Sequence, residues 1–200
     1  MPSARGFAGL TATMVALFAC VASTPTSTRV AAAPAPCEGL AALALPDTVI
    51  ATAQSVPAGS FTPPSGAALA NLPAFCRVAG SIRPSSDSDI RFEVWMPASG
   101  WNRKLQGVGN GGFAGSIDFN ALGAALSRGY AVAATDTGHR GAVVDATWAL
   151  GHPERVADFG YRAIHETAVK ARALVTVLYG GGPARAYFSS CSNGGREALM

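Results

Sequence analysis

Residues 184–200 read Ala-Arg-Ala-Tyr-Phe-Ser-Ser-Cys-Ser-Asn-Gly-Gly-Arg-Glu-Ala-Leu-Met, a β-prone run, a turn of small residues and the start of a helix. Ser190 and Gly194 stand two residues before and two after Ser192. A nucleophile elbow has this arrangement, because its serine occupies a strained strand-to-helix turn with the hydroxyl exposed. We expect Ser192 to be a nucleophile and the Asn193 N–H to face the oxygen of a tetrahedral intermediate. An ordinary Ser/Gly-rich helix start is the alternative.

A second motif, Gly107-x-Gly109-x-x-Gly112, follows a predicted strand further upstream. Asp136 ends the next strand, which brings the pattern close to the dinucleotide-binding fingerprint, where glycines let the backbone approach a pyrophosphate. However, residues 113–116 are predicted as loop instead of helix, and the strand before the motif is the third in the chain. A structural glycine turn is another interpretation. We favour a loop that supplies a second backbone donor to the oxyanion.

Strand and helix patterns alternate along the rest of the chain. Residues 78–83 and 90–96 are expected to pair as antiparallel strands, the second of them half-buried because apolar residues alternate with polar ones. Strands are also predicted at 104–108, 130–135 and 184–190, and helices at 119–128, from Pro153 to Gly180, and from 194. The long helix carries the apolar stripe Ile164, Ala168, Ala171, Val175 and Leu178. These patterns predict an α/β fold with a mixed, mostly parallel sheet and flanking helices.

Composition excludes several classes of protein. The 200 residues are 49% hydrophobic and 14% charged, the reverse of a disordered chain. The formal net charge of +3 comes from 15 basic and 12 acidic residues without a run of either sign. Nucleic-acid binding generally needs a clustered basic face, so no nucleic-acid partner is expected.

The N-terminus has the pattern of a secretory signal peptide. Residues 6–28 carry no charge, Arg5 precedes them, and small residues follow the apolar stretch Met14–Ala22. That stretch is too short for a stable membrane span. Cys20 stands in a lipobox-like context, which leaves a lipoprotein as the alternative. We therefore expect export to the periplasm or the cell exterior.

Export changes the interpretation of the cysteines. The mature chain keeps Cys37, Cys76 and Cys191, none of them in C-x-x-C spacing. In an oxidising compartment Cys37 and Cys76 can pair. Cys191 is then left over, which indicates a partner elsewhere or a free buried thiol.

Six motifs together resemble the tannase/feruloyl esterase family. They are Phe75–Val78, Phe92–Pro97, Gly107–Gly115, Thr135–His139, Trp148–Glu154 and Cys191–Gly195. The resemblance implies an α/β-hydrolase serine esterase that cleaves esters of aromatic acids such as ferulate or gallate.

The resemblance also implies roles for individual residues. Ser192 would be the nucleophile, with the backbone N–H groups of Gly112 and Asn193 as the oxyanion hole. Cys37 would pair with Cys76. Cys191 would pair with a downstream cysteine beside the catalytic histidine.

The expected segments are a signal peptide and the start of a linker at 1–33, an N-terminal segment with the Cys37–Cys76 disulfide at 34–76, and a partial catalytic domain at 77–200. In this fold the acid and the histidine follow the nucleophile along the chain, and Ser192 stands close to the last residue. The chain is therefore expected to be the N-terminal part of an α/β-hydrolase, interrupted just after the elbow and inactive by itself. No metal or cofactor is expected in it, and the family's structural calcium would lie in a lid beyond Met200.

Three local histidines are candidates to replace the missing base. His152 and His165 are expected to be structural, and His139 is a candidate to line the site. Asp136 is expected to hydrogen-bond the local turn. The resulting hypothesis is a secreted serine carboxylic-ester hydrolase with a small aromatic ester as its substrate. An exported, non-catalytic ligand-binding domain with an idle Ser192 is the alternative.

Overall fold

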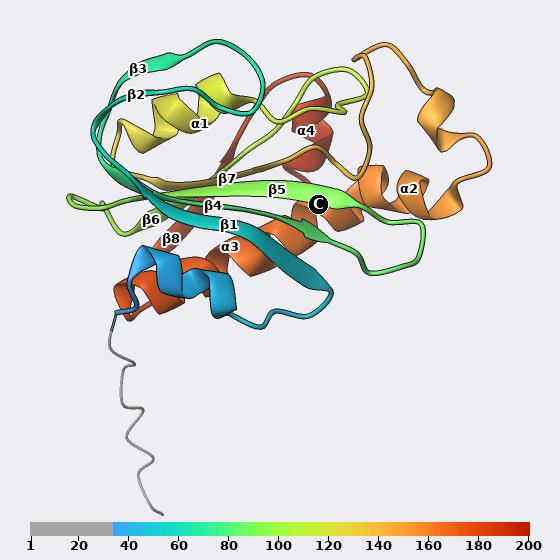
Figure 1. The fold of residues 1–200 in the computed structure, drawn as a ribbon. Coiled ribbons are helices and arrows are strands. Elements are labelled where there is room, and N and C mark those ends of the chain that lie inside the picture. Colours follow the sequence, from blue (N-terminus) through green and yellow to red (C-terminus); the bar gives the residue numbers. More distant parts are fainter. Residues whose placement is uncertain (1–33) are drawn as a thin grey trace, which may run out of the picture. The chain divides into compact units, whose positions relative to one another are not determined.

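Six strands form one mixed sheet in the computed structural model, which describes residues 34–200 (Figure 1). The predicted signal peptide and Cys20 lie outside the described residues. In sheet order the strands are β1 (Thr48–Val56), β4 (Phe75–Ile82), β5 (Ile90–Pro97), β7 (Ala131–Thr135), β6 (Lys104–Val108) and β8 (Arg185–Ser189). The strands predicted from β4 onward are all present.

The sheet combines antiparallel and parallel pairings, as predicted. β1 with β4, β4 with β5, and β5 with β7 are antiparallel, whereas β6 runs parallel to both β7 and β8. Among the described residues the antiparallel pairings are thus the majority, which corrects the expected parallel majority. The reason is that β1, β4 and β5 form an antiparallel meander, and only β6, β7 and β8 are joined by helical crossovers.

Helices cover both faces of the sheet (Figure 1). One core joins the sheet to α3 (Ala163–Tyr179) and the short 3₁₀ helix η1 (Cys37–Ala42). The other core joins it to α1 (Phe119–Leu126) and to the hairpin β2 (Gly59–Phe61)–β3 (Leu69–Leu72). The remaining elements are η2 (Thr147–Ala149), α2 (Pro153–Ala157), the π-helical turn η3 (Asp158–Arg162) and α4 (Asn193–Glu197).

Strand β5 is buried on both faces, so the predicted half-buried strand is wrong. Its Trp95 has no exposed surface and packs against Phe75 at 4.8 Å between ring centroids. The Glu93 carboxylate is also buried, where it accepts hydrogen bonds from Arg77 Nε and Trp95 Nε1, each at 2.9 Å. A buried carboxylate is tolerated because these donors replace its water. The alternation of polar and apolar residues therefore did not mark a solvent-facing side.

The long helix is continuous from Pro153 through the π turn to Tyr179, and Gly180 ends it at φ 70°. Of the predicted stripe, Ile164, Ala171 and Val175 are buried. Ala168 is exposed and Leu178 is half-buried, whereas the buried face of the helix also includes Ala163, Thr167 and Leu174.

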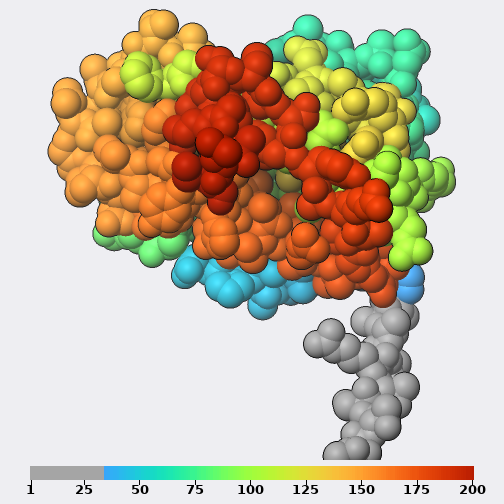
Figure 2. All heavy atoms as spheres, turned by 180° about the vertical axis from the view of Figure 1, so that it is seen from behind, coloured from blue at the N-terminus to red at the C-terminus, as the bar shows by residue number. Residues whose placement is uncertain are grey.

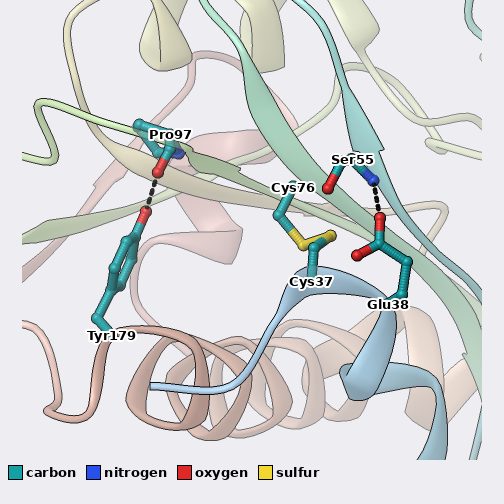
Figure 3. The surroundings of a disulfide bond; sticks show 6 residues. All are labelled: Cys37, Glu38, Ser55, Cys76, Pro97 and Tyr179. Carbon is teal, nitrogen blue, oxygen red and sulfur yellow. Dashed lines mark hydrogen bonds between the residues drawn. A yellow bond between two sulfur atoms is a disulfide. The ribbon is translucent and has the colours of Figure 1, made fainter. Parts of the chain in front are cut away.

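A disulfide joins Cys37 of η1 to Cys76 of β4, with Cα atoms 5.5 Å apart (Figure 3). This confirms the pairing that the family resemblance implied. Nearby, the Ser55 N–H donates to Glu38 Oε1 at 2.8 Å. The segment before Cys76 also contributes strand β1 to the main sheet, where it pairs with β4. The sequence did not predict this strand.

Candidate active site

The chain turns sharply between β8 and α4, and Ser192 stands at the turn. Its φ of 55° and ψ of −122° lie outside the regions that residues with a Cβ favour. Its side chain is exposed, and the backbone of Gly194 donates to the Cys191 carbonyl at 2.9 Å. A strained serine between a strand and a helix is the geometry that the sequence predicted. Figure 2, which views the molecule from behind Figure 1, shows the C-terminal residues, in red, on the surface.

A glycine is required at position 194 because the backbone there lies very close to Ser190. A Cβ added there would overlap the Cβ and Oγ of Ser190. A Cβ added to the next residue, Gly195, would meet nothing within 4 Å. The small residue two positions after Ser192 therefore has a steric reason that its neighbour lacks.

The glycine-rich loop leaves β6 after Val108 and reaches α1 without forming a helix, as predicted. Gly112 adopts a φ of +57°, and a Cβ there would overlap the Val143 carbonyl oxygen. The Phe113 N–H donates to that same carbonyl at 2.8 Å, which fixes the loop against the segment after β7. Only glycine fits this conformation without displacing Val143.

The two predicted oxyanion donors have no backbone acceptor. Among the backbone hydrogen bonds of residues 34–200 outside helices and strands, none has the N–H of Gly112 or Asn193 as its donor. Asn193 is the first residue of α4, where N–H groups also lack partners within the helix. Neither N–H group is thus engaged by a backbone carbonyl of the described residues.

The space beside the glycines at the start of the motif is filled by the protein's own side chains. A Cβ on Gly107 would come within 2.8 Å of the Phe188 ring, and one on Gly109 within 2.9 Å of the same ring. The dinucleotide interpretation requires that space for a pyrophosphate. Asp136 is also occupied, because its Oδ1 accepts from Gly138 N at 2.9 Å and Arg91 N at 3.0 Å. The geometry therefore disfavours nucleotide binding.

More than half of the chain matches a known protein family. The model of tannase and feruloyl esterase matches residues 76–200. The chain belongs to this family. An uncharacterised esterase of Xanthomonas campestris pv. campestris is 51% identical over 170 residues, and a probable feruloyl esterase B-2 of Aspergillus flavus is 32% identical over 124 residues.

A solved member of the family has the same fold. The crystal structure of feruloyl esterase B from Aspergillus oryzae superimposes with a TM-score of 0.75 at 30% identity, covering 80% of this chain and 32% of that one. The architecture is therefore that of an α/β-hydrolase. The match to the Xanthomonas relative includes 85% of this chain but only 30% of that protein. The match to the Aspergillus flavus relative includes 62% of this chain and 23% of that protein.

Glu197 joins the turn at Ser192 to the glycine loop, and the sequence had not indicated this role. Its Oε1 accepts from Asn193 Nδ2 at 2.8 Å and its Oε2 accepts from Asn110 N at 3.2 Å. The one available signal was a glutamate one helical turn after Asn193. Asn110 lies 87 residues before Glu197, so spacing alone did not connect them.

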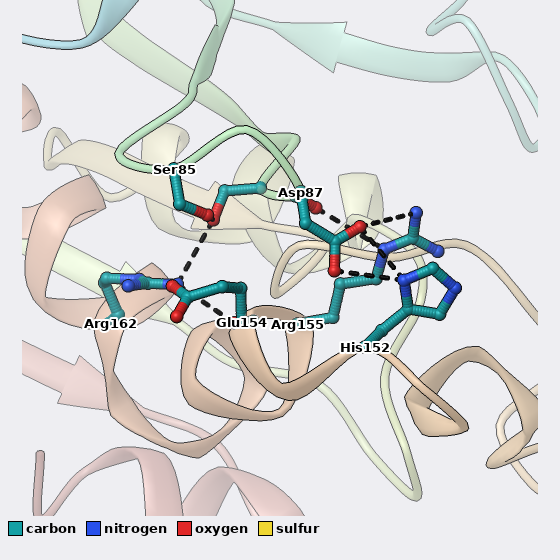
Figure 4. A network of polar contacts seen from close by, with 7 residues as sticks. Ser85, Asp87, His152, Glu154, Arg155 and Arg162 are labelled. Carbon is teal, nitrogen blue, oxygen red and sulfur yellow. Dashed lines mark hydrogen bonds and ion pairs between the residues drawn. The ribbon is translucent and has the colours of Figure 1, made fainter.

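None of the three histidines is hydrogen-bonded to Ser192 among the described residues. His139 is buried and stacks on Trp148 at 3.8 Å between ring centroids, and its burial lowers the pKa of the imidazole. His152 Nδ1 lies 3.0 Å from the Asp87 carboxylate (Figure 4). His165 is exposed on α3. The predictions of structural roles for His152 and His165 agree with these positions.

A polar network surrounds His152 where the long helix begins (Figure 4). Arg155 pairs with Asp87 at 3.1 Å, and Arg162 donates to Glu154 at 2.8 Å. The Arg155–Asp87 pair, together with a hydrogen bond from Arg162 to Ser88 Oγ at 3.1 Å, ties the start of the helix to the loop between β4 and β5. The charged side chains of this network are therefore engaged in structural contacts at the start of the helix.

A cavity of about 350 Å³ lies beside the glycine loop, lined in part by Asn110, Gly111, Ser116, Phe119 and Val143. Exposed apolar side chains, Phe113, Val143 and Val144, stand on the same loops.

Within residues 34–200 no cluster of three or more His, Cys, Asp or Glu is arranged to hold a metal. No helix among these residues has the length and apolarity of a membrane span. Cys191 is exposed and has no disulfide partner within the described residues.

Asp136 makes stability depend on pH. Burial raises the pKa of its carboxyl from 3.8 to about 7. Between about pH 4 and pH 7 the unfolded chain has released this proton and the folded chain has kept it, so the free energy of unfolding decreases as pH rises. Asp136→Asn retains an oxygen for the two backbone donors and cannot ionise. We expect its unfolding free energy to decline less between these pH values than that of the wild type.

Urea denaturation of both proteins at about pH 4.5, 5.5 and 7 measures this difference. Asp145→Asn is the matched control, because that partly exposed carboxyl has a lowered pKa through its hydrogen bonds with Thr147. Parallel pH profiles for wild type and Asp136→Asn would contradict the prediction.

Proposed function

We propose that Ser192 is the nucleophile of a serine carboxylic-ester hydrolase for aromatic-acid esters of the feruloyl or galloyl type. The observation that carries this proposal is the exposed serine at a strained strand-to-helix turn, next to a glycine loop with a free N–H. Membership of the tannase and feruloyl esterase family supports the choice of reaction and of substrate class.

The proposed reaction has two steps. Ser192 Oγ attacks the ester carbonyl carbon while a general base takes its proton, and the carbonyl oxygen becomes an oxyanion held by the N–H groups of Gly112 and Asn193. The tetrahedral intermediate collapses, the alcohol leaves with the proton from the base, and an acyl-enzyme remains. Water, deprotonated by the same base, then releases the aromatic acid and regenerates the serine.

We further propose that the acid and the base come from outside residues 1–200. Within the described residues no histidine is hydrogen-bonded to Ser192, and the two relatives are each more than twice as long as this chain. Residues 1–200 alone are therefore expected to turn over little substrate. We propose the same origin for the disulfide partner of Cys191 and for a structural calcium site.

Export to an oxidising compartment is part of the proposal. The Cys37–Cys76 disulfide supports it, because such bonds persist outside the cytosol. The proposed partner is a small aromatic ester, and neither nucleic acid nor a membrane is a proposed partner.

A fluorophosphonate probe tests the proposal on the product of the complete reading frame. We expect one covalent adduct per chain, located by mass spectrometry on the peptide that contains Ser192. Residues 1–200 expressed alone serve as the comparison and should label slowly or not at all. A folded product without any adduct would favour the ligand-binding alternative, and an adduct on another serine would reassign the nucleophile.

A further inference from the structure

We propose that Glu197 is a positioning residue that fixes the distance between the two halves of the oxyanion hole. This inference rests on the proposed function, because it concerns how the Gly112 and Asn193 donors are held. It also explains the second glycine of the upstream motif.

The carboxylate of Glu197 bridges two segments that are distant in sequence. It is 1% exposed and lies on α4, one turn after Asn193. One oxygen accepts from the Asn193 side-chain amide at 2.8 Å, and the other accepts from the Asn110 backbone N–H at 3.2 Å. The bridge therefore ties the elbow helix to the loop that contains Gly112, two residues after Asn110.

Each end of this bridge is itself oriented. On the elbow side, Arg196 Nε donates to Asn193 Oδ1 at 2.9 Å, which turns the Asn193 amide nitrogen towards Glu197. The Arg196 guanidinium is held in turn by the Gly160 carbonyl and by the Phe159 ring, 4.3 Å from its centroid. The amide orientation is thus determined by its neighbours.

On the loop side, the Asn110 side chain fixes the backbone that Glu197 contacts. Its Nδ2 donates to the carbonyls of Ser116 and Thr135, each at 2.8 Å. Thr135 is the last residue of β7, so Asn110 attaches the loop both to the sheet and, through Glu197, to α4. A shift of Glu197 would consequently move the loop relative to the elbow.

The close approach of the carboxylate depends on Gly109. A Cβ at this position would overlap Glu197 Oε2 and come within 3.0 Å of Ser190 Cβ. Gly109 therefore leaves room for the glutamate and not for a ligand. This accounts for a glycine that the oxyanion hole itself does not require.

Both neighbours of the carboxylate donate hydrogen bonds, so it must act as a double acceptor. Burial raises the pKa of Glu197, whereas Asn110, Asn193 and Arg196 favour its ionised form. Glutamine has the same shape but only one acceptor oxygen. Glu197→Gln thus directs an NH₂ group at one of the two donors and weakens the bridge without creating a cavity.

The experiment compares Glu197→Gln with wild type in the product of the complete reading frame. We expect kcat for methyl ferulate to fall by about 10- to 100-fold with KM within about twofold, because a misplaced donor affects the transition state more than substrate binding. The inhibition constant of phenylboronic acid, which forms a tetrahedral adduct on a nucleophilic serine, should rise by a similar factor.

Glu166→Gln is the matched control. Glu166 pairs with Lys170 at 2.5 Å on α3 and makes no hydrogen bond or ion pair with the glycine loop or with α4 among the described residues, so its variant should keep the wild-type kcat. If Glu197→Gln fails to fold, Asn193→Ala replaces it, since this removes one donor to the carboxylate and retains the backbone N–H.

The outcomes separate the inference from the proposed function. A labelled, active wild type whose kcat and boronate affinity are unchanged in Glu197→Gln overturns the positioning role alone. Reduced stability with unchanged kcat assigns Glu197 a purely structural role and overturns it as well. A wild type that neither labels nor hydrolyses the ester overturns both.

Discussion

Ser192→Ala should lower kcat for methyl ferulate by about 10⁴- to 10⁶-fold in the product of the complete reading frame. The variant removes the only atom that forms the acyl-enzyme, while the oxyanion donors and the binding surface remain. What is left is the modest acceleration of a site that binds and polarises the ester without attacking it. Alanine keeps the Cβ of serine, and the hydroxyl that is lost lies on an exposed residue. The turn should therefore retain its conformation and the fold its stability.

Ser189→Ala is the control for this measurement. Ser189 is an exposed residue at the end of β8, three positions before the proposed nucleophile, and its variant should keep the wild-type kcat. Circular dichroism verifies that both variants are folded. Retention of more than about 1% of the activity by Ser192→Ala would place the nucleophile elsewhere.

The sequence predicted most of the sheet because the strands from β4 onward carry strong local signals. Buried strands such as β7 are uninterrupted apolar runs, and glycines end the neighbouring helices at positive φ. Strand β1 was missed because it is an edge strand with an irregular pairing register between Ile50 and Thr52 and few buried side chains. Local periodicity does not detect a strand that gains its order from pairing with β4.

The candidate site divides in the same way. Ser192, Gly194 and the glycine loop were predicted because backbone conformation requires particular residue types at fixed spacing. Glu197 was not, because its importance lies in contacts to a loop almost half the chain away. Likewise, the prediction of a half-buried β5 failed at Glu93, because its buried partners, Arg77 and Trp95, are known only once β4 and β5 are paired.

Gly194→Ala should reduce kcat/KM by about 100-fold or more, although it adds a single methyl group. The new Cβ would overlap Ser190 Cβ, an atom that no rotation of the Ser190 side chain can move. The backbone of the turn must therefore shift, and with it the Ser192 hydroxyl and the Asn193 N–H. Displacements of about 1 Å at a reacting centre cost roughly this factor. The overlap should also lower the free energy of unfolding by about 1–3 kcal/mol.

Gly195→Ala provides a control of the same chemistry one residue away. Its Cβ has open space, so both kcat/KM and the free energy of unfolding should stay close to the wild-type values. Steady-state hydrolysis of methyl ferulate and urea denaturation measure the two quantities for each variant. Equal activity in Gly194→Ala and Gly195→Ala would mean that the turn adapts freely. The strain at Ser192 would then not be needed to hold the nucleophile, because a serine in a relaxed turn would react equally well.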